Sequence, residues 1–115
     1  MMIYCVHEHE LLPGVDVTQY EHDVAQAIAT MKIPGLLHSH HLKGIGGVRS
    51  GRYAVLWVFA NEEALLQIFG GPREQTWPAD WLHYEDVVLA PYLDRHGDKI
   101  DFTDYRPLCE VAYAK

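Results

Sequence analysis

The sequence has few cysteines, few basic residues and no long apolar run. Two cysteines, Cys5 and Cys109, are too few for a disulfide framework, so we expect free thiols in a reducing cytoplasm. Nine basic residues against 16 acidic ones give a formal net charge of −7, which argues against nucleic acid or an anionic membrane surface as a partner. No apolar stretch approaches the ~20 residues of a membrane span, and the acidic N-terminus lacks the basic region of a secretory signal.

Familiar catalytic and metal-binding motifs are also missing. The sequence contains no HExxH, CxxC or GxSxG pattern, so no zinc site, redox motif or serine nucleophile is indicated. The glycine-rich segment 44–47 precedes a predicted strand instead of opening a helix, which indicates a hairpin and not a dinucleotide site. The sequence is rich in histidine instead, with eight in 115 residues.

The rest of the chain is organised around residues 52–60, the most apolar run. Both alternating faces of this predicted strand are apolar, which is typical of a central strand covered on both sides. Further strands are predicted over residues 2–10, 36–45 and about 102–113. The second is polar on both faces, which suits an edge, and Pro107 removes a ladder donor from the last, which must therefore lie at an edge or carry a bulge.

Two helices follow the first and third strands. Asp16 is the expected cap of the first, with Gln19 completing a capping-box-like pair, and an apolar stripe at spacings of three and four runs to Met31. Asn61 is the expected cap of the second helix, which Gly70 ends.

A third helix is predicted before the last strand. Residues 73–77 read as a polar loop, after which Pro78 suits the first turn of a helix that runs to about Arg95. Pro91 is expected to kink this helix or shorten its regular part, and Gly97 to stop it.

This order of elements predicts a single α+β domain over residues 1–115 with a ferredoxin-like fold. Its four-stranded antiparallel sheet carries helices on one face, plus the extra helix before the last strand. Because the helices cover one face and the central strand is apolar on both, a second copy is expected to cover the other, the two sheets pairing into a dimeric barrel. We assign the odd-numbered face, with Trp57 and Phe59, to the interior between the two sheets.

Several local features resemble the dimeric α+β barrel superfamily, which includes antibiotic-biosynthesis monooxygenases and stress-responsive barrel proteins. These features are the Pro-Gly pairs at residues 13–14 and 34–35, the glycine-rich hairpin and the run 57–64. The resemblance implies a homodimer with a closed sheet and a pocket beside it. Its members include cofactor-free oxygenases, haem-degrading enzymes, isomerases, cyclases and proteins without known activity.

Five of the histidines fall in two short stretches. His7 and His9, like His38 and His40, are two residues apart on a predicted strand, so each pair points to one face at ~6.5–7 Å Cα spacing. Cys5 shares the face of the first pair. The two strands should lie roughly 9–10 Å apart, which strains direct chelation by both pairs. Three interpretations stay open: the rim of a substrate pocket with His7 and His38 as bases, surface or interface side chains, and a tight metal site.

Aromatic residues supply the remaining candidates. The odd-numbered face of the central strand would form a substrate-binding wall or ordinary core, with Tyr53, Val55, Trp57 and Phe59. On the third helix, His83 is a candidate base and Tyr84 a candidate proton donor beside Trp81, unless they lie only at the border of the helix's apolar face. In haem-binding and cyclase relatives, the resemblance implies, a histidine in this segment often faces the cavity.

The sequence therefore predicts a cytoplasmic homodimer that binds a small molecule. Its chemistry would be cofactor-free oxygenation, or acid–base isomerisation or cyclisation, of an aromatic or polyketide-like substrate. One alternative is a haem or divalent-metal binder that uses the histidine-rich strands. Another is a non-catalytic ligand-binding or interaction protein.

Overall fold

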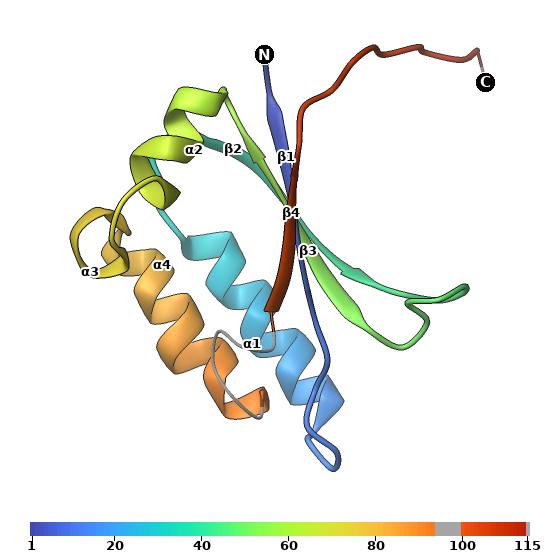
Figure 1. The fold of residues 1–115 in the computed structure, drawn as a ribbon. Coiled ribbons are helices and arrows are strands. Elements are labelled where there is room, and N and C mark those ends of the chain that lie inside the picture. Colours follow the sequence, from blue (N-terminus) through green and yellow to red (C-terminus); the bar gives the residue numbers. More distant parts are fainter. Residues whose placement is uncertain (94–99, 115) are drawn as a thin grey trace.

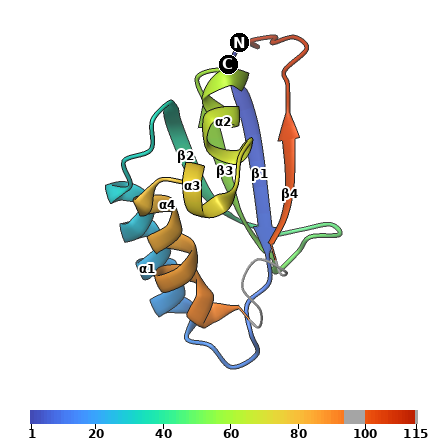
Figure 2. The ribbon, with the colours of Figure 1, turned by 60° about the vertical axis from the view of Figure 1, so that its left-hand side comes forward.

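The computed structural model describes residues 1–93 and 100–114. Within them, one antiparallel sheet has the strand order β2-β3-β1-β4, and helices lie on one of its faces (Figures 1 and 2). This is the predicted ferredoxin-like α+β arrangement, with the first strand beside the third and fourth. The strands are β1 (Ile3–His9), β2 (Leu36–Lys43), β3 (Tyr53–Phe59) and β4 (Ile100–Tyr105).

The helical layer begins with the two capped helices that the sequence predicts. The side chain of Asp16 accepts a hydrogen bond from the backbone N–H of Gln19 at 3.1 Å, and Asn61 accepts one from Ala64 at 2.8 Å. The side-chain amide of Gln19 bonds to the carboxylate of Asp23 and not to the backbone N–H of Asp16, so only half of the capping box forms. The helical elements are α1 (Val17–Thr30), α2 (Glu62–Phe69), α3 (Arg73–Thr76), α4 (Ala79–His83), the π-helix η1 (Tyr84–Leu89) and the 3₁₀-helix η2 (Ala90–Tyr92).

The third predicted helix is one continuous helical segment, but it is not regular. Its α-helical part ends at His83, before Pro91, and the backbone N–H of Ala90 bonds to Glu85 five residues back. The predicted polar loop over 73–77 is wrong, because α3 forms there with backbone bonds to the carbonyl of Pro72. The predicted end of the helix near Arg95 and its stop at Gly97 lie outside the described residues.

The last strand is an edge strand, as predicted, but it is shorter than predicted. β4 ends at Tyr105, so the expected continuation to residue 113 is wrong. Pro107, two residues later, has no N–H to donate to a ladder and fixes its own φ, which favours ending the pairing here. Residues 106–114 continue without regular secondary structure.

The core lies between the helices and the odd-numbered face of β1 and β3. Trp57 and Phe59 are fully buried there, and the Trp57 ring packs against Trp81 at 4.5 Å and Tyr84 at 5.5 Å between centroids. The assignment of this face to the interior of a dimer is therefore wrong, because the chain's own helices cover it. Both faces of β3 are apolar, so hydrophobic alternation did not distinguish them.

The even-numbered face of the sheet is the open one. Its central residues are Tyr4, Val6 and Leu56, which are half-buried, and Val58, which is buried. In the described part of the chain, no helix lies over this face (Figure 1). None of the helices in that part has the length and apolar character that a membrane span requires.

Candidate functional site

A β-bulge in β2 decides which histidines come together. Leu36 pairs with Phe59 and His38 with Val58, so Leu37 is an extra residue in the ladder. A regular ladder would have paired His38 with Trp57 on the helix-covered face. The extra residue turns the side chains after it to the opposite faces.

The predicted grouping of His38 and His40 with His7 and His9 is therefore wrong. His38 and His40 are exposed on the open face, and His41 lies on the helix-covered face instead. Histidine pairs on opposite faces of one sheet cannot converge on a ligand. Among residues 1–93 and 100–114, no three His, Cys, Asp or Glu side chains form a group that could hold a metal ion.

A cavity of about 260 Å³ lies between the sheet and the helical layer, beside β4. Aromatic rings and three titratable side chains line it, a combination typical of sites for small organic molecules. From the sheet come His7, Ile100, Phe102 and Asp104, and from the helical layer Phe69, Trp77 and Glu85. We call this the His7 cavity.

The imidazole of His7 is surrounded by aromatic rings. Its centroid lies 5.9–6.3 Å from those of Trp57, Phe69, Trp81 and Phe102, each in an edge-to-face arrangement. Burial lowers the pKa of His7 to about 4, against the opposing effect of the Asp104 carboxylate. The ring is therefore neutral at pH 7, with a nitrogen lone pair able to accept a proton.

Two carboxylates line the same cavity as this imidazole. Glu85 is buried and accepts a hydrogen bond from the indole N–H of Trp81 at 2.8 Å, with Arg73 at 3.7 Å. Asp104 lies opposite Cys5 across β1 and β4. Burial, and secondarily a hydrogen bond to Asp104, raises the pKa of the Cys5 thiol well above its usual range, which favours the protonated thiol at neutral pH.

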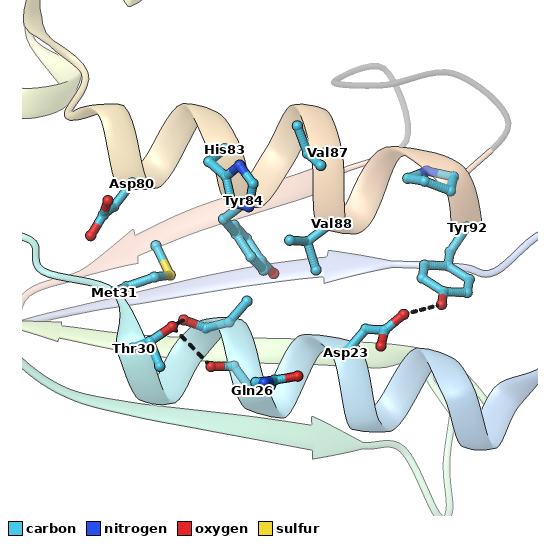
Figure 3. A pocket seen from close by; sticks show the side chains of 12 residues that line it. Asp23, Gln26, Thr30, Met31, Asp80, His83, Tyr84, Val87, Val88 and Tyr92 are labelled. Atoms are coloured by element: carbon cyan, nitrogen blue, oxygen red, sulfur yellow. Dashed lines mark hydrogen bonds between the residues drawn. The ribbon is translucent and has the colours of Figure 1, made fainter.

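The predicted helix residues line a different cavity. His83 and Tyr84 border a space of about 450 Å³ between α1 and the α4–η1 segment (Figure 3). His83 is exposed, while Tyr84 is buried and burial raises its pKa above the usual range. The structure therefore does not bring these two residues together with His7.

His9 belongs to a third group, a buried hydrogen-bonded chain. The hydroxyl of Tyr20 bonds to Nε2 of His9 and, at 2.9 Å, to Nε2 of His41. Desolvation lowers the pKa of His9 to about 4, lowers that of His41 and raises that of Tyr20. With one O–H, Tyr20 donates to one imidazole and accepts an N–H from the other.

Sequence reasoning included Tyr20 only in the apolar stripe of its helix. A hydroxyl within that stripe, facing a strand that carries histidine, is the signal that would have found it. It also missed the six other residues of the His7 cavity: Phe69, Trp77, Glu85, Ile100, Phe102 and Asp104. Phe102 could have been predicted, because it pairs with His7 across β1 and β4.

The candidates on β3 are mainly core residues. Val55 and Phe59 are buried and line none of the cavities described above. Trp57 reaches the site only through its ring contact with His7 at 6.2 Å. Tyr53 points to the other end of the sheet, where its hydroxyl donates to Glu21 at 2.6 Å.

The sequence matches no protein-family model and no curated protein. Solved structures, in contrast, share its architecture. A DABB-family protein from Mesorhizobium loti, described as having a ferredoxin-like fold, superposes with a TM-score of 0.65 at 16% identity over 94% of this chain and 98% of its own. The chain has the ferredoxin-like fold.

Two further ferredoxin-like neighbours have informative descriptions. SnoaB from Streptomyces nogalater, a cofactor-independent oxygenase whose structure is that of a mutant, gives a TM-score of 0.64 at 12% identity over 97% of this chain and 98% of its own. A dimeric ferredoxin-like protein of unknown function from Jannaschia gives 0.60 at 17% identity over 93% and 100%. At these identities the likeness establishes the fold alone.

Proposed function

We propose that this ferredoxin-like chain binds a small, flat aromatic molecule in the His7 cavity and that His7 removes a proton from it without a cofactor. The observation that carries the proposal is a neutral imidazole set among aromatic rings, with the Asp104 carboxylate beside it. Aromatic walls favour a planar apolar substrate, and a neutral imidazole has a nitrogen lone pair that can accept a proton.

The proton-transfer step uses only groups of the cavity. A ring nitrogen of His7 accepts a proton from an acidic C–H or phenol of the substrate, whose bonding electron pair stays on the substrate as an enolate or phenolate. The imidazolium that forms is stabilised by the negative charge of Asp104. Returning the proton at another carbon completes an isomerisation. In a cyclisation the enolate carbon bonds to a carbonyl carbon of the same substrate, and the imidazolium returns its proton to the alkoxide oxygen that forms there.

Oxygenation is the second candidate. The likeness to SnoaB, a cofactor-independent oxygenase, favours it. The electron-rich anion left after proton removal by His7 would react with molecular oxygen as the oxidant. In this reading the protein supplies the base and the aromatic enclosure, and the substrate supplies the electrons.

The test uses anthrone, a flat ketone with an acidic C–H, as the probe. His7→Gln should leave quenching of tryptophan fluorescence by anthrone within about twofold of wild type, because the aromatic walls remain. It should lower the rates of C–H deuterium exchange and of oxygen uptake at least ~100-fold. The control is His83→Gln, in the other cavity, with wild-type rates. Unchanged rates in His7→Gln would refute the base, and binding without exchange or uptake in wild type would leave a non-catalytic binder.

We further propose that two copies pair through their even-numbered sheet faces. The half-buried Tyr4, Val6 and Leu56 provide apolar surface there, and a dimeric protein is among the structural neighbours. Leu56→Glu places a charge at the centre of this face and should yield monomers in sedimentation velocity. The matched change Leu66→Glu, at an exposed position of α2, should not. A wild-type protein that stays monomeric at about 100 μM would refute the dimer.

A further inference from the structure

The interhelical cavity, by which we mean the space of about 450 Å³ between α1 and the α4–η1 segment, has no part in the function proposed above. The two helical segments run antiparallel, and a hydrogen bond joins them at each end of the cavity. The carboxylate of Asp80 accepts the backbone N–H of Lys32 at 2.7 Å, and the carboxylate of Asp23 accepts the hydroxyl of Tyr92 at 2.6 Å. A carboxylate is therefore held at each end (Figure 3).

The charge of the interhelical cavity suits a cation. Hydrogen bonds from Tyr92 and, secondarily, from Gln19 lower the pKa of Asp23, so this carboxylate is ionised at neutral pH. None of the described residues that line the cavity is a lysine or an arginine, and the whole chain carries a formal net charge of −7. A carboxylate at each end favours a ligand that carries a positive charge at each of its own ends.

A buried hydroxyl lies between the two carboxylates. Tyr84 is only 3% exposed, and its ring extends from the α4–η1 segment towards α1, into the cavity (Figure 3). Within residues 1–93 and 100–114, no group forms a hydrogen bond with this hydroxyl. A buried polar group is normally paired, because leaving it without a partner costs free energy. The hydroxyl of Tyr84 is therefore available to a polar group in the middle of a ligand.

The separation of the carboxylates sets the length of the ligand. On the α1 side, the chain from Asp23 to Lys32 rises by about 14 Å at a helical 1.5 Å per residue. On the opposite side, the chain from Asp80 to Tyr92 rises by about 18 Å. Extended spermine, a linear tetraamine with single bonds of about 1.5 Å, covers roughly 16 Å from end to end. A ligand of this length reaches both carboxylates at once.

We propose that the interhelical cavity binds a linear aliphatic polyamine. Its terminal ammonium groups lie against Asp23 and Asp80, where charge-assisted hydrogen bonds form. An inner secondary ammonium donates to the hydroxyl of Tyr84, which supplies the missing partner. The methylene groups between the nitrogens pack on Met31 and Val88, which line the same space.

Isothermal titration calorimetry with spermine in about 0.15 M NaCl tests the proposal. One spermine per chain should bind with a dissociation constant below about 100 μM. Asp23→Asn and Asp80→Asn should each weaken binding at least ~10-fold, while the amide oxygen can still accept the hydrogen bond that joins the helices. Tyr84→Phe should weaken it at least ~3-fold without lowering the urea midpoint, because the hydroxyl has no partner within the described fold. The matched control is Glu63→Gln, the same charge change at an exposed position of α2, which should leave binding unchanged.

The length of the ligand provides a second test. Putrescine is too short to join the two carboxylates and should bind at least ~10-fold more weakly than spermine. His7→Gln should bind spermine as wild type does, so this proposal and the function proposed for the His7 cavity can fail separately. No saturable binding up to about 1 mM spermine would overturn the proposal. Equal weakening by Glu63→Gln and Asp80→Asn, or equal affinity for putrescine and spermine, would also overturn it, by showing a diffuse attraction to an acidic protein.

Discussion

His7 and His9 lie two residues apart on one face of β1, yet their surroundings differ. His9 is hydrogen-bonded to Tyr20, which in turn bonds to His41, so its ring nitrogen Nε2 already has a partner within the fold. His7 faces aromatic rings and lines a cavity with Asp104. Both imidazoles are kept neutral by burial, with pKa values of about 4. A lowered pKa therefore does not distinguish the two histidines, whereas the cavity beside the ring of His7 does.

The largest expected effect is the loss of folding stability that His9 causes as the pH falls. Its pKa is lowered by burial first, then by His41, Arg52 and His7, from an ordinary 6.5 to about 4. Between these values the unfolded chain binds more protons than the folded one, so stability is full above pH 6.5 and falls as the pH drops towards 4, by up to about 3 kcal/mol for this group.

Urea unfolding at about pH 4.5 and about pH 7.5 measures this loss, in the Leu56→Glu background, where we expect monomers. His9→Gln removes the titrating group and should show a smaller difference between the two pH values, while the exposed His38→Gln should match wild type. Equal pH dependence in wild type and His9→Gln would contradict the buried neutral state of His9.

The next effect tests the hydrogen-bonded chain itself. Tyr20→Phe removes the hydroxyl that joins His9 and His41 and leaves two buried imidazoles without that partner, which should lower the free energy of unfolding by about 1–3 kcal/mol. Tyr92→Phe is the matched control, because its hydroxyl bonds to the exposed side of α1 at Asp23 and should matter less. The two urea midpoints decide the comparison, and equal losses would argue against a special role for the hydrogen bonds that join His9, Tyr20 and His41.

The smallest effect concerns the histidines on the other side of the sheet. His38→Ala and His40→Ala should change the unfolding free energy by less than about 0.5 kcal/mol, because both side chains are exposed. The measurement belongs in the Leu56→Glu background, where we expect monomers and no interface contribution. A loss above about 1 kcal/mol would show that these side chains have partners within the protomer.

Much of the fold could be predicted from local chemistry. The caps at Asp16 and Asn61, the edge position of β4 and the central position of β3 all follow from residue types and their spacing. The π-helical turn was missed because it depends on packing that no short pattern encodes, whereas the early end of β4 could have been predicted from Pro107.

The site was harder to predict, because one extra residue in β2 turns the side chains after it to the opposite faces of the sheet. The bulge at Leu37 moves His38 and His40 to the open face and brings His41 beside Tyr20. Strand alternation assumes a regular ladder and cannot detect such an insertion. His7 was found from the sequence, but Glu85 and Asp104 come from distant segments that only the tertiary fold brings to it.

We propose, above all, that His7 is a neutral base open to a ligand while His9 is held within the fold. Long-range ¹H–¹⁵N NMR spectra of the imidazoles, titrated from about pH 3.5 to 8 with and without anthrone, examine both histidines at once. We expect His7 to titrate near pH 4, and anthrone to shift its nitrogen resonances while those of His9 stay in place. Titration of His7 near its ordinary value of 6.5, or no change at His7 on saturation with anthrone, would contradict this proposal.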